Sequence, residues 1–578
     1  MKHIINNNIT DNIGSVYGNI YDKYKYEIYV AVLSILVFIV HVHLASTLNF
    51  GNDEAHYYVW SLKQSLGYLD DAPLVSYIIY IFTGVFGKSE LSVRLGAVVM
   101  SFFDGFLIYY LSQVLFKSKR ASFFAFLFFL SALIFNSVLS VMILPDASLL
   151  FFYLCFLISF YKAVEYKNRG LGFNLFWILS GLFLGLAFLS KYTAALIPVS
   201  VLLYLIFSKK HRGLLKTFYP YAALGIALLV FSPVIYWNFM HNFISFKFQL
   251  FHGFSHPNPG FPLFIDGWAG QFLVITPFIY IYLIGVFAYS LRLILGKKRL
   301  KFDSDSSFSA NFQDIREGFL YSVSLSLPIL LFFIVNGYSH RTLVHWPDIG
   351  YLAAFPIMGY TADLLIKKKN FLLKYYIYFS IFFGFFLFFV LYNQIYYNSI
   401  PVGKIIKYID KEKQLKKGGV FALIPHIPGK PKTANITDDL FGWKKSAKYL
   451  NMVYKGYKTT YSPLFILTHH YAIADELVYY GDYKPAVNIY NISDFLNQYD
   501  LWQNLNKING ENAIFIMDNK YMINPTDVYE KDFKSIKKIG RLDIYINLRL
   551  IRVYYLYLMK DFNAKKSIKQ LTSKSRTY

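Results

Sequence analysis

Isolated ionisable side chains lie in the short polar turns that separate the long apolar runs of this chain. The set that could share one chemistry comprises Asp53, Glu54, Asp70, Asp71, Asp146 and Lys191. An ionisable group at membrane depth costs roughly 2.5–3.5 kcal/mol on insertion scales, so each is a functional candidate by default. A carboxylate can take a proton from an attacking hydroxyl, and a lysine ammonium can hold a phosphate. The set therefore predicts a site that combines a general base with an anion-binding group.

A later polar turn adds further cations. Its sequence, NGYSHRTLVHWP at residues 336–347, contains Arg341 and the protonatable side chains of His340 and His345. Together with Lys191 these groups suit a phosphate. A sugar carried on a lipid phosphate would use both the carboxylates and the cations. The cations would stabilise the departing phosphate, and a carboxylate would face C1 of the sugar. The lipid tail would stay in the bilayer.

The apolar runs are long enough to be membrane helices. The chain has 578 residues, of which 56% are hydrophobic and only 16% charged, whereas about a quarter of a soluble chain is charged. Runs of the length that crosses a bilayer begin near residues 28, 92, 120, 146, 172, 193, 218, 268, 318, 347 and 372. Residues 73–86 are too few for a span and predict a re-entrant or juxtamembrane helix. We therefore expect a polytopic α-helical membrane protein with about 11 spans plus this helix.

Clusters of lysine and arginine set the orientation of these spans. They lie at residues 23–25, 117–120, 162–169, 209–212, 297–301 and 367–369. All of them are inside if the N-terminus is cytoplasmic, as the positive-inside rule requires, and counting 73–86 as a span would reverse them. We expect a cytoplasmic tail at 1–27, a transmembrane domain at 28–395 and a periplasmic domain at 396–578. The first apolar run is too long for a cleavable signal peptide and predicts a signal anchor.

The last third of the chain has the pattern of a soluble domain. Strand-like runs such as GGVFALIP, NAIFIM and RLDIYINLRLIRVYYLYL alternate with helical stretches such as GWKKSAKYLNMVY, which predicts an α/β fold. The chain carries a net charge of +24. A basic domain outside the cell membrane cannot meet cytoplasmic nucleic acid, so anionic headgroups or lipopolysaccharide phosphates are its expected partners. A merely solvated basic surface is an equal alternative.

Several segments, taken in order, resemble a known family. They are the Asp53–Glu54 pair, GYLDDAPLVSY, PDA at the start of a span, LSKYTAALIP, HWPDIGYLAAFP and, in the tail, DLFGW, HHYAIADELVYY and NQYDLW. The chain resembles the bacterial branch of the protein O-mannosyltransferase superfamily, which includes the aminoarabinose lipid A transferase. These are C-type glycosyltransferases that use polyprenyl-phosphate sugars. The resemblance extends over most of the chain.

The resemblance implies roles for particular residues. Its acidic pair matches Asp53 and Glu54, the first of which is the usual candidate base or acceptor-orienting group. A second acidic position matches Asp146, and the lysine that follows a helix rich in Gly and Ser matches Lys191. The aminoarabinose transferases have a lysine directly before the proline of the first loop, where this chain has Ala72. This departure argues against assigning the same sugar.

Each candidate also has a structural interpretation. Asp53 and Asp146 could cap helices, Asp70 and Asp71 could form a turn before Pro73, and Lys191 could extend to lipid headgroups. We expect Asp53, Glu54 and Asp146 to be catalytic, Lys191, Arg341, His340 and His345 to bind the donor phosphate, and Asp70, Asp71 and Tyr192 to bind substrate. Cys155 is the single cysteine, which excludes a disulfide framework and a Cys-based zinc site. No metal site or cofactor is predicted, although Asp70 and Asp71 could recruit a divalent cation.

The sequence predicts a membrane glycosyltransferase that moves a sugar from a polyprenyl-phosphate donor to lipid A or lipopolysaccharide at the periplasmic face. Its partners would be this donor, the envelope acceptor and the bilayer, with no nucleic acid. One alternative is transfer to a protein acceptor, as in protein O-mannosylation. Another is a lipid or sugar transporter, although such proteins more often carry broken-helix pairs and internal repeats, and we find no repeat here.

Overall fold

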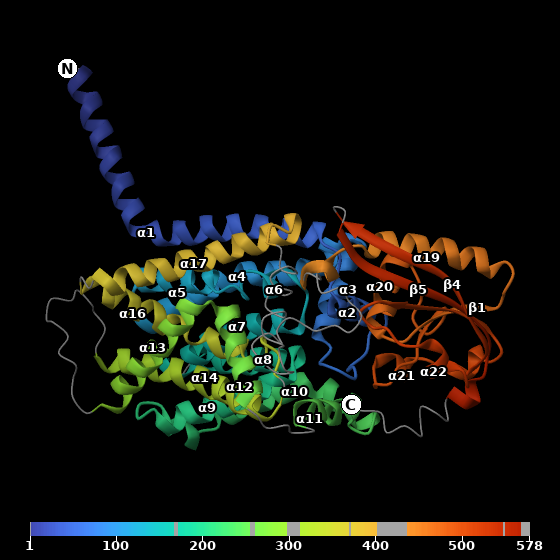
Figure 1. Ribbon diagram of the computed structural model, residues 1–578. Helices are drawn as coiled ribbons and strands as arrows, with labels where there is room; N and C mark the ends of the chain where they lie inside the picture. The colour runs from blue at the N-terminus through green and yellow to red at the C-terminus, as the bar shows by residue number, and fades with distance from the viewer. Residues whose placement is uncertain are drawn as a thin grey trace.

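The protein consists of a helical bundle with a mixed α/β domain attached to one end (Figure 1). The computed structural model describes residues 2–166, 171–254, 261–296, 312–340, 342–368, 371–400, 436–546 and 549–567. Within these ranges, the helices long and apolar enough to cross a membrane number eight, at Tyr21–Thr47, Glu90–Phe116, Pro145–Glu165, Tyr219–Met240, Pro277–Leu295, Phe312–Ser339, Asp348–Lys367 and Phe371–Tyr397. The polytopic α-helical class is therefore confirmed, while the number of spans remains a prediction.

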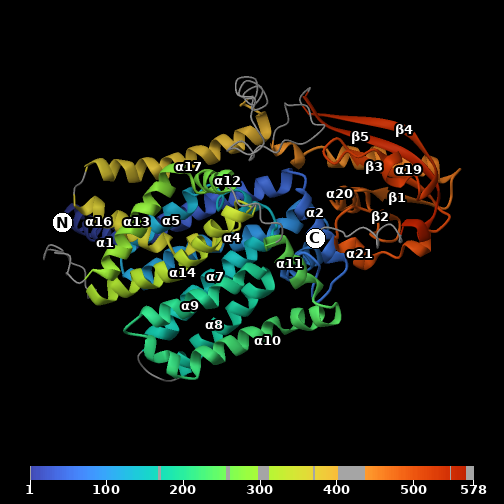
Figure 2. The same cartoon turned by 60° about the horizontal axis from the view of Figure 1, so that its bottom comes forward.

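The long helices run roughly parallel along the bundle, and shorter ones complete it (Figures 1 and 2). The bounds in the first half of the chain are α1 Lys2–Thr47, α2 Asn52–Leu62, α3 Leu74–Phe86, α4 Glu90–Phe116, α5 Lys119–Ser131, α6 Val138–Val141, α7 Pro145–Glu165, α8 Leu171–Ser190, η1 Tyr192–Ala195, α9 Leu196–Phe207, η2 Arg212–Lys216, α10 Tyr219–Met240 and α11 Ile244–Phe254. The bundle continues with α12 Phe261–Ile275, α13 Pro277–Leu295, α14 Phe312–Ser339, α15 Asp348–Leu352, α16 Phe355–Lys367 and α17 Phe371–Tyr397.

Two of the predicted runs are broken rather than continuous helices. The run near residue 120 forms α5, which ends at Ser131, and then the single turn of α6. The run near residue 268 forms α12 and α13, separated by Thr276 at φ 77°. A residue that precedes proline is disfavoured in the helical region, so Pro277 explains the break before α13.

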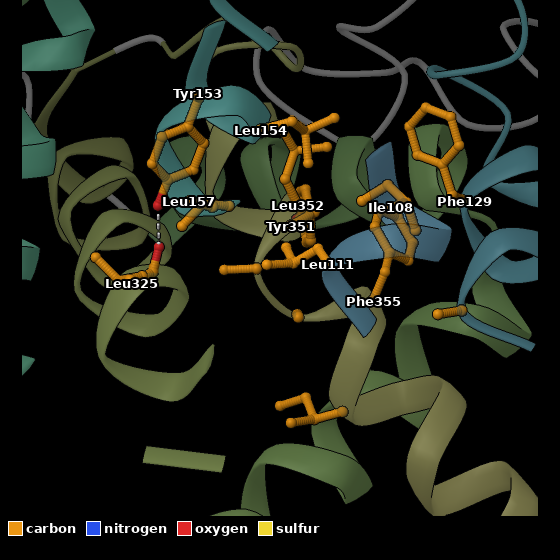
Figure 3. Packing of buried hydrophobic residues seen from close by; sticks show 14 of the residues in the cluster. Ile108, Leu111, Phe129, Tyr153, Leu154, Leu157, Leu325, Tyr351, Leu352 and Phe355 are labelled. Carbon is orange, nitrogen blue, oxygen red and sulfur yellow. Dashed lines mark hydrogen bonds between the residues drawn. The ribbon is translucent and has the colours of Figure 1, made fainter. Parts of the chain in front are cut away.

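The bundle is held by close backbone approach and by internal hydrogen bonds. A side chain at Gly384 of α17 would lie 2.0 Å from the carbonyl oxygen of Ser131, so only glycine allows this contact between helices. The Tyr153 hydroxyl of α7 donates to the carbonyl oxygen of Leu325 in α14 at 2.6 Å (Figure 3). Such bonds matter because polar groups inside a bilayer have no water to bind.

The C-terminal domain contains one five-stranded sheet in the order β2-β1-β3-β5-β4. Strand β1 pairs in parallel with β2 and β3, and β5 is antiparallel to both β3 and β4. The bounds are η4 Ile436–Leu440, α19 Trp443–Lys458, β1 Leu464–Thr468, α20 Tyr471–Gly481, β2 Ile489–Asn491, α21 Gln498–Trp502, η5 Leu505–Ile508, β3 Asn512–Asp518, α22 Pro525–Tyr529, β4 Phe533–Ile546 and β5 Arg549–Phe562.

The α/β prediction for this domain is confirmed in most of its parts. NAIFIM lies in β3, GWKKSAKYLNMVY begins α19, and the long run from Arg541 forms the end of β4 and then β5. The expected strand GGVFALIP lies outside the described residues, so the boundary at 396 remains a prediction.

Helix α2 joins the two parts of the molecule through a shared hydrophobic core. Ala55 and Val59 of α2 belong to the same buried cluster as Trp443, Ile473 and Leu477 of the C-terminal domain. Helices α2 and α20 lie side by side in both views (Figures 1 and 2). The first polar loop of the membrane part therefore has its place fixed by the C-terminal domain.

Candidate active site

Asp53 is an accessible carboxylate at the start of helix α2. The helix begins after the N-cap residue Gly51, so Asp53 occupies its second position, and the capping acceptor is instead Glu54, which accepts a hydrogen bond from the Gly51 amide at 2.9 Å. Among the described residues no hydrogen bond reaches Asp53, and its side chain is exposed. The structure thus leaves Asp53 open to a substrate rather than using it as a cap.

Glu54 has a different environment and is fully buried. Its oxygens accept from Nε and Nη2 of Arg94 at 2.7 and 2.6 Å, and Oε1 also accepts from the Ile143 amide at 3.1 Å. The Arg94 guanidinium in turn donates to backbone carbonyl oxygens that include that of Leu48, at 2.7 Å. The predicted catalytic role of Glu54 does not agree with this geometry, because its acceptor sites are occupied inside the protein. Glu54 positions α2.

The surroundings of Asp53 raise the pKa of its carboxyl group, which makes the carboxylate a stronger base. The protein around it removes bulk water from the carboxylate and thereby raises its pKa, an effect that the negative charges of Asp70 and Glu54 increase. The positive charges of His56 and Lys520 act in the opposite direction, and the net pKa is raised. A general base is most effective when its pKa approaches the working pH.

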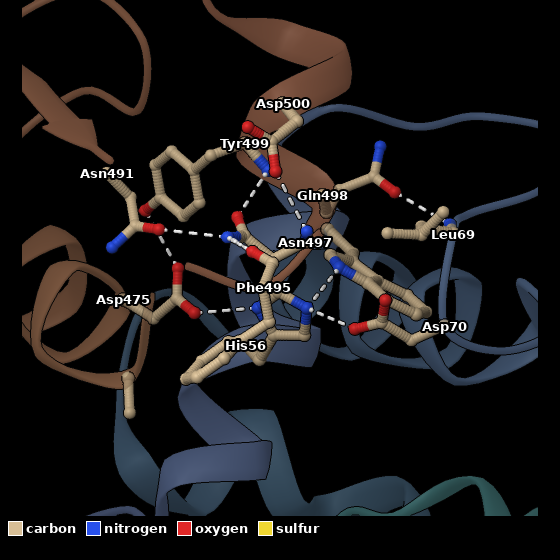
Figure 4. A network of polar contacts seen from close by, with 12 residues as sticks. His56, Leu69, Asp70, Asp475, Asn491, Phe495, Asn497, Gln498, Tyr499 and Asp500 are labelled. Atoms are coloured by element: carbon tan, nitrogen blue, oxygen red, sulfur yellow. Dashed lines mark hydrogen bonds and ion pairs between the residues drawn. The ribbon is translucent and has the colours of Figure 1, made fainter. Parts of the chain in front are cut away.

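His56 lies one helical turn after Asp53 and connects the site to the C-terminal domain (Figure 4). Its Nδ1 donates to Asp475 at 2.7 Å and its Nε2 lies 3.1 Å from Asp70. Burial alone would lower the pKa of His56, but the two carboxylates raise it to about 10. The sequence analysis missed both His56 and Asp475. The i,i+3 spacing from Asp53 is a signal that could have indicated His56, whereas nothing local marks Asp475.

Lys191 and Asp146 form a second, buried part of the site. The ammonium of Lys191 donates to both oxygens of Asp146, at 2.7 and 2.8 Å. Lys191 follows α8 and is 9% exposed, and Asp146 is 4% exposed at the second position of α7. The headgroup-contact interpretation of Lys191 does not agree with this geometry, and the N-cap residue of α7 is Leu144 rather than Asp146. The pair brings together two groups that the sequence separates by 45 residues.

Three further groups surround the pair. Burial raises the pKa of Asp71 to about 7, although Lys191 lowers it, and burial lowers the pKa of His345 to about 4. His345 is therefore neutral near pH 7 in the protein without substrate, and its predicted contact with the donor phosphate remains a prediction. Asp348 is 1% exposed, and neither of its carboxylate oxygens has a hydrogen-bond partner among the described residues. The sequence analysis did not assign Asp348 a role.

Tyr57 lies between the two parts of the site. The charges that act on its hydroxyl include Asp71, Asp53, Asp70 and Asp146, and burial is the largest cause of its raised pKa. Tyr57 is thus a phenol donor in a group of carboxylates that come from three separate polar segments. It follows Asp53 by four residues, so it lies on the same face of α2.

The structure describes two of the remaining predicted residues, Tyr192 and His340, but not Arg341. Tyr192 is half-buried, and its hydroxyl lies 2.9 Å from Ser245 Oγ of α11. The Gln249 amide of α11 also donates to the Asp70 carbonyl oxygen. His340 is half-buried directly after α14, and Arg341 lies outside the described residues. No set of three His, Cys, Asp or Glu side chains in the described ranges could hold a metal ion.

Comparisons with known proteins agree with this architecture. Residues 70–237 match the family model described as dolichyl-phosphate-mannose-protein mannosyltransferase. The chain is 28% identical over 166 residues to undecaprenyl phosphate-alpha-4-amino-4-deoxy-L-arabinose arabinosyl transferase 2 of Proteus mirabilis, which covers 27% of this chain and 29% of that protein. It is 23% identical over 317 residues to lipid A galacturonosyltransferase RgtD of Rhizobium johnstonii, covering 53% and 59%. The matches thus span less than two thirds of either relative.

The fold extends this similarity over nearly the whole chain. The crystal structure of ArnT from Cupriavidus metallidurans bound to undecaprenyl phosphate aligns with a TM-score of 0.57 at 11% identity, covering 92% of this chain and 98% of that one. The apo structure of the same protein gives 0.56 at 12% identity with the same coverage. The chain therefore has the fold of the C-type membrane glycosyltransferases. Its architecture is similar to that of ArnT over 92% of the chain.

Proposed function

We propose that this protein transfers a sugar from a polyprenyl-phosphate donor to lipid A or lipopolysaccharide at the periplasmic face of the inner membrane. The observation that carries the proposal is the exposed carboxylate of Asp53, which accepts no hydrogen bond among the described residues and shares a site with the buried Lys191–Asp146 pair. The similarity to lipid A transferases and to an undecaprenyl-phosphate-bound structure supports the classes of donor and acceptor.

The site has the groups that a displacement at the sugar C1 requires. If the acceptor is a hydroxyl, Asp53 takes its proton while the hydroxyl oxygen attacks C1. The bond between C1 and the donor phosphate oxygen breaks, and the electron pair leaves with the polyprenyl phosphate. Lys191 stabilises the departing phosphate by sharing its ammonium between that group and Asp146. Arg341 remains a predicted second cation for the phosphate.

An acceptor phosphate would change the role of Asp53. A lipid A phosphate is already anionic and needs no base, so Asp53 would then orient the sugar or the acceptor. Asp70 and Asp71 would accept hydrogen bonds from sugar hydroxyls, and the Tyr57 phenol would donate one. Tyr192, anchored to α11, would help to close the site.

Mass spectrometry of lipid A from cells with and without the gene tests the proposal directly. The proposed function predicts one added sugar mass that disappears with the gene and returns with the intact chain. Donor labelled in its sugar should then transfer label to the lipid extract in a membrane assay. Unchanged lipid A and lipopolysaccharide, together with no labelled lipid product, would contradict the proposal.

A second candidate is transfer to protein. The observation that favours it is the match of residues 70–237 to the protein mannosyltransferase family model. The same labelled donor distinguishes the two candidates, because the label would remain in the protein fraction after lipid extraction. The catalytic roles of Asp53 and Lys191 would be the same in both reactions.

A further inference from the structure

His56 is the polar contact at which the C-terminal domain reaches the acidic loop of the membrane part. On one side of the ring, Nδ1 donates to Oδ2 of Asp475 in α20 at 2.7 Å. On the other side, Nε2 lies 3.1 Å from Oδ2 of Asp70. His56 is 3% exposed and Asp475 is fully buried, so water does not replace the contact between them. Figure 4 shows both contacts of the ring.

The Nε2 atom has two competing neighbours. Besides Asp70 it has the indole Nε1–H of Trp60, also at 3.1 Å. An indole N–H only donates and an ionised carboxylate only accepts, so Nε2 can serve one of them at a time. A cationic His56 donates to Asp70, whereas a neutral ring with its proton on Nδ1 accepts from Trp60. The protonation of His56 therefore decides whether Asp70 is held.

Asp475 favours the cationic form. It is a buried carboxylate whose other oxygen accepts from the Tyr499 hydroxyl at 2.8 Å, so its position is fixed from the C-terminal side. A buried carboxylate that lacked a cation would be strongly unfavourable. The imidazolium satisfies Asp475 and at the same time brings a positive charge close to Asp53, on which it acts electrostatically.

We propose that Asp475 is a positioning residue for the acidic loop: through the imidazolium of His56 it holds Asp70 in place and keeps a cation beside Asp53. The C-terminal domain thus acts on the acidic loop through His56. The kinetic consequence rests on the proposed glycosyl transfer. The electrostatic consequence, a buried ion pair between the two parts of the chain, does not depend on it.

Other titratable groups also act on this region and must be considered in any pH experiment. Those that face His56 or share its electrostatic environment are Asp53, Tyr57 and Asp70 from the membrane part and His470, Tyr471, Asp475 and Lys520 from the C-terminal domain. Burial lowers the pKa of His470 to about 3, so His470 stays neutral over the working range. The tyrosines stay protonated, because burial raises their pKa values.

The kinetic test compares Asp475→Asn with the intact full-length protein in membranes. Without its carboxylate partner, His56 becomes neutral, accepts a hydrogen bond from Trp60 and releases Asp70. Asp53 then keeps Lys520 but loses the nearby charge of His56. We expect kcat to fall by ~10-fold or more, as for a misplaced proton-transfer group, and the acid limb of the pH profile to move upward. The KM for donor should change little. A uniform loss at every pH with no shift of the limb would contradict the proposal.

A double-variant cycle adds a second criterion. If Asp475 acts through His56, then Asp475→Asn in a His56→Gln background should cause no further loss of kcat. If instead the two substitutions together lowered kcat by the product of their separate factors, Asp475 would act independently of His56, and the proposal would be overturned. Asp482→Asn is the matched control, because Asp482 forms an exposed ion pair with Lys88 across the same two parts of the chain. Its kcat and pH profile should be those of the intact protein.

A stability measurement tests the ion pair even if no transfer activity is found. His56 has a pKa of about 10 in the folded protein and an ordinary value of 6.5, so its stabilising effect is present at pH 6 and is lost as the pH rises toward 10. The thermal midpoint of Asp475→Asn should therefore lie furthest below that of the intact protein near pH 6, and the gap should narrow toward pH 9.5. A gap independent of pH would overturn the proposal, whereas absent glycosyl transfer in the intact protein would contradict only the proposed function.

Discussion

Asp53 and Glu54 are neighbours in the chain, but their carboxylates lie in opposite surroundings. Asp53 is exposed and accepts no hydrogen bond from the described residues, while Glu54 is buried and bound by the Arg94 guanidinium at 2.7 and 2.6 Å. Successive residues of a helix point about 100° apart, so one side chain can face the site while the next faces the interior. The buried member holds the first turn of α2, and the exposed member remains accessible.

Replacement of Asp53 by asparagine should abolish transfer without unfolding the protein. The substitution keeps the size of the side chain and removes its basicity, and the helix cap is supplied by Glu54. We expect kcat to fall by ~10²- to 10⁴-fold, the range for a general base, with donor binding retained. Turnover of labelled donor by purified protein measures the change, and Asp482→Asn serves as the control carboxylate. Turnover near that of the intact protein would rule out Asp53 as the base.

Replacement of Arg94 by methionine should lower the thermal stability of the protein. The change leaves Glu54 buried without its cation, which costs about 3–5 kcal/mol for a broken buried pair. Lys88→Met, which breaks the exposed pair with Asp482, should have no measurable effect by comparison. Thermal denaturation of the two variants in detergent would show the difference. Equal midpoints would mean that the Glu54–Arg94 pair does not hold α2.

Variants of the Lys191–Asp146 pair can separate a role in phosphate binding from a role in stability. Lys191→Met should weaken binding of undecaprenyl phosphate and also destabilise the protein, because Asp146 is left buried alone. The double variant Lys191→Met/Asp146→Leu should recover most of the stability, since an apolar pair can replace a buried ion pair. The affinity of the double variant for undecaprenyl phosphate should stay low. Recovery of affinity in the double variant would show that Lys191 does not bind the phosphate.

Asp71 should make stability depend on pH between about 4 and 7. Burial raises its pKa to about 7 from an ordinary value of 3.8, so the folded state binds a proton that the unfolded state has already lost in this range. Stability from this group therefore falls as the pH rises from 4 to 7 and is constant above. Asp71→Asn removes that fall. The thermal midpoint of the variant should therefore rise relative to that of the intact protein as the pH increases from 4 to 7. A constant difference across this range would exclude the raised pKa.

The class of fold could be predicted from local properties, while the side of the membrane on which the site lies remains a prediction. A long apolar run predicts a membrane helix, and a cluster of lysines predicts a cytoplasmic turn. Each of these signals depends only on residues that are close together in the sequence. These signals predicted the polytopic architecture and placed Asp53, Asp146 and Lys191 in polar turns between the apolar runs. They did not predict that α5 and α12 would end early, because helix breaks depend on packing as well as on composition.

The pairing of charges was decided by the tertiary structure alone. The sequence determined which residues could ionise, but Glu54 was expected in the site and lies in the interior with Arg94, and burial lowers the pKa of His345 to about 4 in the protein without substrate. Burial and the nearest opposite charge set both outcomes, and those neighbours come from distant segments. The contact between His56 and Asp475 joins residues 419 positions apart. No local pattern can show such a contact, because only folding brings the two side chains out of water together.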